Sequence, residues 1–223
     1  ALTRLLYGGP ARAQASAERA RSLAGGVTRR EQQQIEVIAA VVTGDVERWR
    51  GSLREHLAAF PRDALLLSFA WFTFSGARDW REQRLDYMLQ RRDAYGDDWW
   101  FLGMLGMAMQ DADRLADARR LTERSLGRYP RNYGAAHALS HVYYETNDHR
   151  SGLDFLTGWM APYQEAAPYH CHLTWHRALF ELTSGRYQRA LALFAGIRDA
   201  DAALSQLPDA ASLLWRCRLY GYT

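Results

Sequence analysis

Residues 185–194 read Gly-Arg-Tyr-Gln-Arg-Ala-Leu-Ala-Leu-Phe, and in this stretch small and aromatic side chains recur at the spacing of a helical face. Ala190 follows Tyr187 by three residues, and Phe194 follows Ala190 by four. Residues at these separations lie on the same side of an α-helix. A small side chain allows a second helix to approach closely, and the aromatic ring fills the gap that remains. The stretch therefore predicts the second helix of a tightly packed helical hairpin.

Breaks between helical segments recur along the chain with a nearly constant period. The turns inside the predicted hairpins fall at Pro10, Gly44, Arg78, Asp113, Asn147 and Gly185, with spacings of 34, 34, 35, 34 and 38 residues. A helix–turn–helix unit of 34 residues is the tetratricopeptide period. We therefore expect an all-α fold, a right-handed superhelix of tetratricopeptide-like hairpins (an α-solenoid). One helical-repeat domain of about five to six hairpins would cover residues 1–223, as part of a longer protein.

The period assigns each helix to one of two classes. First helices of the hairpins are predicted at 30–43, 64–77, 99–112, 133–146, 171–184 and 209–220. Second helices are predicted at 11–24, 46–59, 80–94, 114–128, 149–160 and 186–198. Side chains of the N-cap type precede several of them, namely Thr28, Asp63, Asp79, Asp98 and Asn132. Gly103 and Gly106 fall inside a predicted helix, where small size favours close packing.

Six of the seven histidines lie between residues 137 and 176. His137 and His141 are four residues apart, as are His172 and His176, so each pair shares one helical face. Neighbouring helices in such a stack lie about 8–10 Å apart, so the two pairs could converge on one centre. Imidazole ligands, with Glu145 one turn beyond His141, would suit a transition metal such as Zn, Fe or Cu.

Three interpretations of these histidines stay open. They could be metal ligands, acids and bases acting on an organic ligand, or hydrogen-bonding spacers between packed helices. In either functional case, the candidate catalytic residues are His137, His141, His172 and His176. His56 and His149, on second helices, are expected to be solvated, as are the arginines of those helices, including Arg84.

First helices would line the concave face of the superhelix. Candidate ligand-binding residues on this face are Trp100, Met104, Met107, Tyr144 and Trp175. Aromatic and Met side chains at helical spacing are also typical of a core. A groove lined by Trp, Met and His suits a flat, largely apolar small molecule better than an acidic peptide, since grooves that bind peptide carboxylates usually carry Lys and Arg.

Composition excludes several other functions. All 28 basic residues are Arg, so lysine Schiff-base chemistry and the Walker A motif are excluded. The net charge of +3 is small and has no basic run, so nucleic acid is not an expected partner. Two cysteines make no disulfide framework, and charged residues interrupt every apolar stretch, so we expect no membrane partner. Without a visible signal peptide, the expected location is the cytoplasm.

Two histidine-containing segments resemble a known family. His137-Ala-Leu-Ser-His-Val142 and His172-Leu-Thr-Trp-His-Arg-Ala-Leu-Phe180, followed by residues 185–191, are similar to the tetratricopeptide repeat protein 38 family, which includes bacterial StaR-like proteins. The resemblance covers about 55 residues and extends to His137, His141, His172, Trp175 and His176. It implies a helical-repeat fold and, for the StaR-like group, an oxidative role in antibiotic gene clusters.

Together these features predict a histidine-lined concave pocket for a small molecule, a metal ion or both, in a protein of bacterial specialised metabolism. The alternative is a scaffold that binds a protein partner in the same groove and has no catalytic activity.

Overall fold

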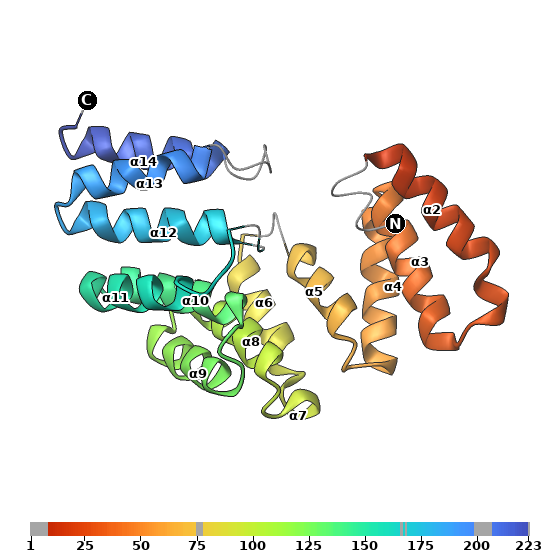
Figure 1. Cartoon of the computed structure of the whole chain (residues 1–223). Helices are drawn as coiled ribbons and strands as arrows, with labels where there is room; N and C mark the ends of the chain where they lie inside the picture. Colours follow the sequence, from red (N-terminus) through yellow and green to blue (C-terminus); the bar gives the residue numbers. More distant parts are fainter. Residues whose placement is uncertain (1–8, 75–77, 166, 168, 199–206, 223) are drawn as a thin grey trace. The chain divides into compact units, whose positions relative to one another are not determined.

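The computed structural model describes residues 9–74, 78–165, 167, 169–198 and 207–222, and every regular element in these ranges is helical (Figure 1). The elements are α2 (Pro10–Ser22), the 3₁₀ turn η1 (Ala24–Gly26), α3 (Arg29–Thr43), α4 (Val46–Ala59), α5 (Ala64–Thr73), α6 (Trp80–Leu89), α7 (Arg92–Tyr95), α8 (Trp99–Asp111), α9 (Leu115–Arg128), α10 (Tyr133–Glu145), α11 (His149–Met160), α12 (His170–Thr183), α13 (Tyr187–Arg198) and α14 (Leu207–Leu219). The predicted all-α class is confirmed for these residues.

Most predicted helices begin and end within two residues of the observed ones. The main difference lies in the segment 80–94, predicted as one helix, which is divided into α6 and α7 at Gln90 and Arg91. The predicted helix 64–77 is described only as far as Thr73 because residues 75–77 lie outside the described part.

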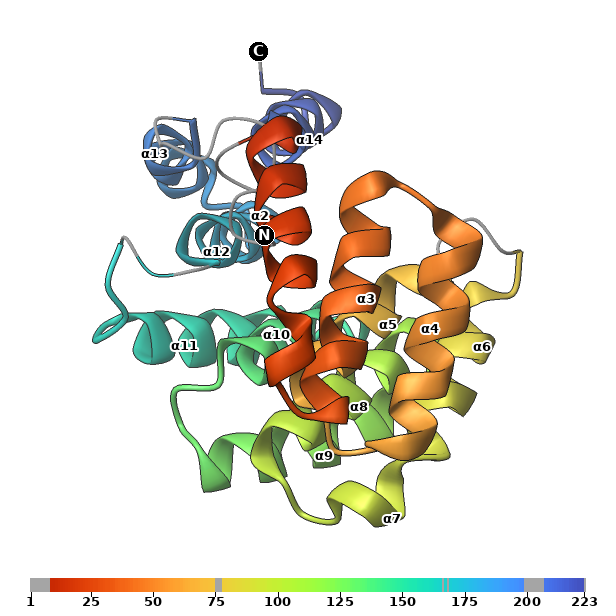
Figure 2. The same ribbon diagram turned by 90° about the vertical axis from the view of Figure 1, so that its right-hand side faces the viewer.

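The chain divides into two compact units, residues 1–96 and 97–223. In the first unit, α3 packs against both α2 and α4, and α4 also contacts α5. In the second unit, α8 and α9, α10 and α11, and α12 and α13 pair in sequence, and α14 packs on α12 and α13 (Figure 1, Figure 2). Helix α10 also contacts α8 and α12, so the second unit is a layered stack of hairpins. A superhelix over the whole chain stays a prediction.

Four of the predicted hairpin turns share one backbone feature. Gly44, Asp113, Asn147 and Gly185 have φ angles of 75°, 58°, 58° and 73°. A residue with this left-handed conformation commonly ends a helix and lets the chain reverse into the next one. The repeating turn positions therefore correspond to a repeating turn geometry, even where the residue is not glycine.

The N-caps are confirmed except at one helix. Thr28 forms a full capping box with Glu31, and Asp63, Asp98 and Asn132 accept hydrogen bonds from the first backbone N–H groups of α5, α8 and α10. The prediction was wrong for Asp79, which makes no such bond to α6 and accepts one from the Gln83 side chain.

Glycine allows close helix contact in the second unit, as predicted. A β-carbon on Gly106 would lie 2.6 Å from Cγ2 of Thr122 on α9, and one on Gly103 would lie 2.7 Å from Nδ2 of Asn132. These distances are shorter than any ordinary carbon contact, so α8 needs glycine at both positions.

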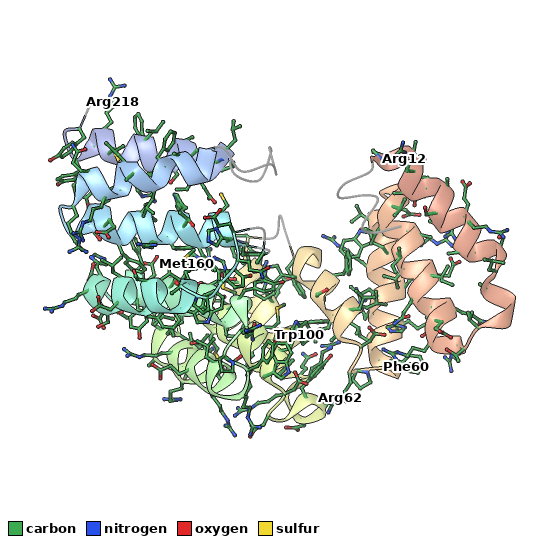
Figure 3. The ribbon with its side chains drawn as sticks, in the orientation of Figure 1. Arg12, Phe60, Arg62, Trp100, Met160 and Arg218 are labelled. Carbon is green, nitrogen blue, oxygen red and sulfur yellow. The ribbon has the colours of Figure 1, made fainter. Side chains whose placement is uncertain are left out.

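The prediction that His56 is solvated was wrong. This side chain is fully buried, with its Nε2 atom 3.0 Å from the Asp63 carboxylate and its Nδ1 atom 3.2 Å from Gln33. Asp63 also accepts bonds from Arg30 and Gln34, so one carboxylate connects α3, α4 and the start of α5. In the same unit, Figure 3 shows Phe60 and Arg62 between α4 and α5.

Arg84 is also buried, with 7% exposure, contrary to expectation. Its guanidinium lies 3.7 Å from the centre of the Trp71 ring and 4.4 Å from that of Trp80, and it donates to the Trp71 carbonyl. Aromatic faces attract a guanidinium that is shielded from water, which explains the burial. Among the described residues, no helix is long and apolar enough to cross a membrane.

Candidate metal centre

The candidate centre lies between two neighbouring first helices of the second unit. Helix α10 begins after the Asn132 cap and carries His137 and His141, and α12 carries His172 and His176. Small residues Ala135, Ala136 and Ala138 are fully buried on α10, which allows the helices to lie close together. The predicted convergence of the two histidine pairs is confirmed.

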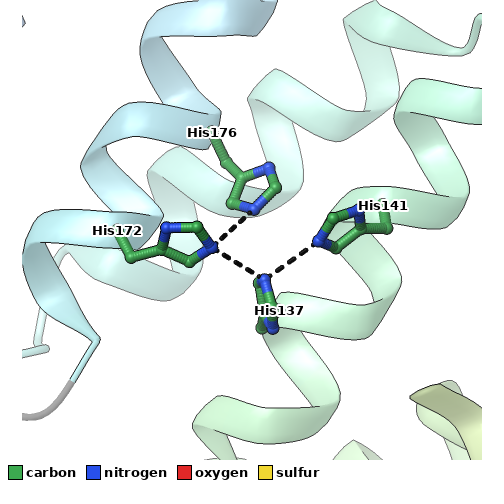
Figure 4. A group of neighbouring side chains, drawn as sticks. All are labelled: His137, His141, His172 and His176. Atoms are coloured by element: carbon green, nitrogen blue, oxygen red, sulfur yellow. Dashed lines mark hydrogen bonds between the residues drawn. The ribbon is translucent and has the colours of Figure 1, made fainter. Parts of the chain in front are cut away.

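The four imidazoles turn their Nε2 atoms toward one another (Figure 4). Nε2 of His137 lies 3.0 Å from that of His141 and 3.0 Å from that of His172, and Nε2 of His172 lies 3.2 Å from that of His176. One nitrogen from each of the four rings lies within 4.8 Å of every other. The rings therefore surround a common point with their nitrogen atoms directed inward.

Hydrogen bonds alone cannot account for all three short contacts between these Nε2 atoms. An Nε2 atom carries either one proton or one lone pair, so it takes part in one full hydrogen bond. Four such atoms make at most two full bonds, whereas the site contains three short Nε2–Nε2 contacts. A cation at the centre would accept all four lone pairs at once.

The surroundings favour neutral imidazoles, which is the form that binds metal ions. Burial, together with charge on the neighbouring imidazoles, holds the pKa of His137 and of His176 well below the ordinary value. Burial, followed by the charge of His172, lowers the pKa of His141 to about 4. At neutral pH these three rings therefore retain a lone pair, although which nitrogen carries the remaining proton depends on its hydrogen bonds.

Three further side chains surround the centre. The carboxylate of Asp209, on α14, lies 2.7 Å from Nδ1 of His172. The Trp175 ring stacks on His172 at 5.2 Å and meets His176 edge-on at 4.7 Å. Tyr169 lies 5.5 Å from His137 and 5.9 Å from His172, measured between ring centres. The centre is thus held by α10, α12 and the start of α14.

Access to the centre is uneven. His176 is 3% exposed, whereas the side chain of His172 keeps 30% exposure. The histidine group is therefore more exposed to solvent at His172 than at His176.

Other predicted site residues lie outside the histidine group. Glu145 is exposed and is not part of the group. The Tyr144 ring contacts His149 and Phe180, at 5.3 Å and 6.1 Å between ring centres. His149 is half-buried, with its ring centre 6.3 Å from that of Phe180, so it is partly solvated.

The remaining ligand-binding candidates lie on α8, and two further potential ligand residues lie at the start of α12. Trp100, Met104 and Met107 are half-buried on α8, and their role in ligand binding stays a prediction. Cys171 donates to the Ile197 carbonyl and is not part of the histidine group. His170 is the first residue of α12 and stacks with Tyr163, again outside the group.

Two residues of the centre were not predicted from the sequence. A signal for Asp209 was present, since it lies four residues before Leu213 and eight before Cys217, on one face of a helix. All three are buried in the structure. Tyr169 offers no such signal because it precedes α12 in the left-handed conformation, with φ 65°.

An all-imidazole donor set restricts the ions that fit. Imidazole nitrogen suits Zn²⁺, Cu²⁺, Fe²⁺ and Ni²⁺, whereas Mg²⁺ and Ca²⁺ prefer oxygen ligands. A comparison with models of known protein families finds none that matches this chain.

Proposed function

We propose that residues 97–223 bind one divalent transition-metal ion through Nε2 of His137, His141, His172 and His176. The observation that carries this proposal is the convergence of four Nε2 atoms with separations of 3.0, 3.0 and 3.2 Å along the group. Zn–N bonds of about 2.0–2.1 Å place tetrahedral ligands about 3.3 Å apart. The three short separations lie within a few tenths of an ångström of this value, and the remaining pairs, which lie within 4.8 Å, would move closer when an ion binds.

The same distances also fit ligands that are adjacent in an octahedral site, which are about 2.9 Å apart at these bond lengths. Such a site would keep positions for an exogenous ligand, and the exposed side of His172 supplies a route to them. When bound, the ion would act as a Lewis acid, and Fe or Cu would add one-electron chemistry.

The arrangement of the helical hairpins around the metal centre is part of the same proposal. We propose that the hairpins form a tetratricopeptide-like array with the metal centre on the face of its first helices, as the 34-residue turn spacing and the shared turn geometry suggest. The resemblance of the histidine segments to the tetratricopeptide repeat protein 38 family agrees with this assignment. A small molecule that binds beside the metal ion would contact Trp175 and Tyr169, the aromatic rings nearest to the imidazoles.

The test is metal analysis of untagged protein, followed by titration of the metal-free protein with Zn²⁺ and with Co²⁺. We expect about one equivalent of bound ion and, for Co²⁺, visible d–d absorption that reports the coordination geometry. His137→Ala and His141→Ala should lose this binding while keeping the helical circular dichroism of the parent.

Two histidines of the same unit provide matched controls. His149→Ala and His170→Ala remove half-buried imidazoles that lie outside the group, so both should bind the ion as the parent does. Absence of stoichiometric binding by the parent, or equal losses in all four variants, would contradict the proposal.

A further inference from the structure

We propose that Asp209 is a positioning residue of the metal centre, which holds His172 in the tautomer and orientation that direct its Nε2 lone pair at the ion. This inference rests on the proposed function. The proposed metal ligands come from α10 and α12, and this inference adds a carboxylate from a third helix, α14.

The contact between the two side chains has the geometry of a strong, charge-assisted hydrogen bond. Oδ2 of Asp209 lies 2.7 Å from Nδ1 of His172, and the two residues are 37 positions apart in the chain. A carboxylate accepts but does not donate when ionised, so the proton of this bond belongs to Nδ1. A neutral His172 then carries its lone pair on Nε2, the atom that faces His137 and His176.

Burial of Asp209 makes its hydrogen bond to His172 important for the orientation of the imidazole. Asp209 is 8% exposed, and its side chain keeps 12% of its exposure beside His172. A carboxylate at this depth requires a partner because water supplies little of its solvation. The Nδ1–H group of His172 is the hydrogen-bond donor that the described structure provides, so rotation of the imidazole would remove it.

The position of Asp209 on its helix fixes the carboxylate in place. Asp209, Leu213 and Cys217 form the buried stripe through which α14 packs on the rest of the unit, whereas Leu214 and Leu219 stay exposed. Asp209 also lies in the first turn of α14, where the helix dipole favours a negative charge. Its role in the site must therefore be separated experimentally from a role in helix stability.

Carboxylates that accept from the second nitrogen of a metal-bound histidine usually raise its basicity and fix its orientation, and their loss typically weakens metal binding 10- to 100-fold. We expect Asp209→Asn to weaken the binding of Zn²⁺ by about this factor, measured by competition with a chromophoric chelator. Asp154→Asn, at an exposed carboxylate of α11, should leave the affinity unchanged.

Three outcomes are distinguishable. If the parent binds no ion, the proposed function fails and this inference fails with it. If the parent binds Zn²⁺ and Asp209→Asn binds it equally well, the metal centre stands and the positioning role is overturned. Weaker binding by Asp209→Asn, with unchanged unfolding of the metal-free protein, supports the role.

A second measurement covers the case in which Asp209→Asn does not fold. In the parent loaded with Zn²⁺, long-range ¹H–¹⁵N spectra of the imidazoles report which nitrogen of His172 carries a proton. We expect a protonated Nδ1 and a metal-bound Nε2. A protonated Nε2 with Nδ1 on the metal would overturn the inference.

Discussion

Gly152 on α11 faces Phe180 on α12 so closely that a β-carbon added to the glycine would lie 2.5 Å from Cζ of the ring. Phe180 is fully buried, and Cβ of Tyr143 would lie 2.9 Å from the same added atom on another side. Helix α11 and helix α12, which carries His172, are therefore in contact through a site with no spare volume.

Gly152→Ala should destabilise the protein for this reason. Overpacking of a filled core typically costs about 1–3 kcal/mol, more than the gain in helix propensity from Gly to Ala. Gly158→Ala on the same helix is the control, since nothing lies within 4 Å of its added carbon. Denaturant unfolding should show a loss of stability in the first variant and none in the second. Equal stability of the two variants would mean that α11 and α12 move apart freely.

Asp63→Ala should destabilise the first unit more than removal of an ordinary helix cap. The change removes the cap of α5 and the hydrogen-bond partner of the buried His56, for an expected loss of about 2–4 kcal/mol in the free energy of unfolding. Asp45→Ala is the matched comparison because Asp45 caps α4 through one exposed bond, worth about 1 kcal/mol. Similar losses in the two variants would show that the buried network around His56 contributes little.

The metal-free protein should lose stability as the pH falls from about 6.5 toward 4. In the folded state the pKa values of His137, His141 and His176 are lowered, that of His141 to about 4, so the unfolded chain binds more protons in this interval. Stability therefore rises with pH across this window and levels off above the ordinary histidine pKa. His141 alone should contribute roughly 1–3 kcal/mol to the change.

Urea unfolding at a series of pH values, in the presence of a chelator, measures this dependence. His141→Gln should show a shallower slope between pH 6.5 and 4 because the ring that resists protonation is absent. An unchanged slope would contradict the assignment of the effect to these imidazoles.

Zn²⁺ should stabilise the helices that supply its ligands. An ion at a free concentration of 100 times its dissociation constant adds about 2.7 kcal/mol to the free energy of unfolding. In hydrogen exchange, amides of α10 and α12 should gain protection, whereas those of α3 and α4, in the other compact unit, should not. His141→Ala should remove the gain, and uniform protection of the whole chain would indicate nonspecific association instead.

The repeating pattern predicted the helices well because it reflects local properties. Cap residues, turn residues and helical periodicity act over a few positions, and most of the predicted helices agree with the observed ones within two residues. The break between α6 and α7 was missed because no Gly or Pro marks residues 90 and 91. The helical pattern of the sequence continues through residues 90 and 91, whereas the helical backbone is interrupted there.

The positions of His56 and Arg84 show what the pattern lacks. Both are on second helices, which the superhelical pattern assigns to an outer face, and both are buried. His56 is buried because Asp63, after the next turn, folds back onto it, and Arg84 because the rings of Trp71 and Trp80 cover it. These contacts depend on which side chains pack together in three dimensions, and the 34-residue spacing of the turns does not specify this.

The histidine group, in contrast, could be predicted because its contacts follow from the spacing of residues in the sequence. Spacing of four residues places each pair on one helical face, and neighbouring first helices bring the two faces together. Asp209 could not be assigned to His172 in the same way, since the contact joins residues 37 positions apart and depends on how α14 packs.

Repeated turns and caps give α8 and α10 equivalent residues, separated by the 34 positions between Asp98 and Asn132. By this equivalence Gly103 and Met107 on α8 correspond to His137 and His141 on α10. The neighbourhood of Gly103 is already filled by Asn132, so α8 has no room for an imidazole there. Two helices with equivalent caps and turns thus differ at these positions, since α8 packs closely there and α10 contributes to the convergent nitrogen atoms. The four convergent nitrogen atoms come from two neighbouring hairpins, so the contact between hairpins, and not one hairpin alone, builds the histidine group.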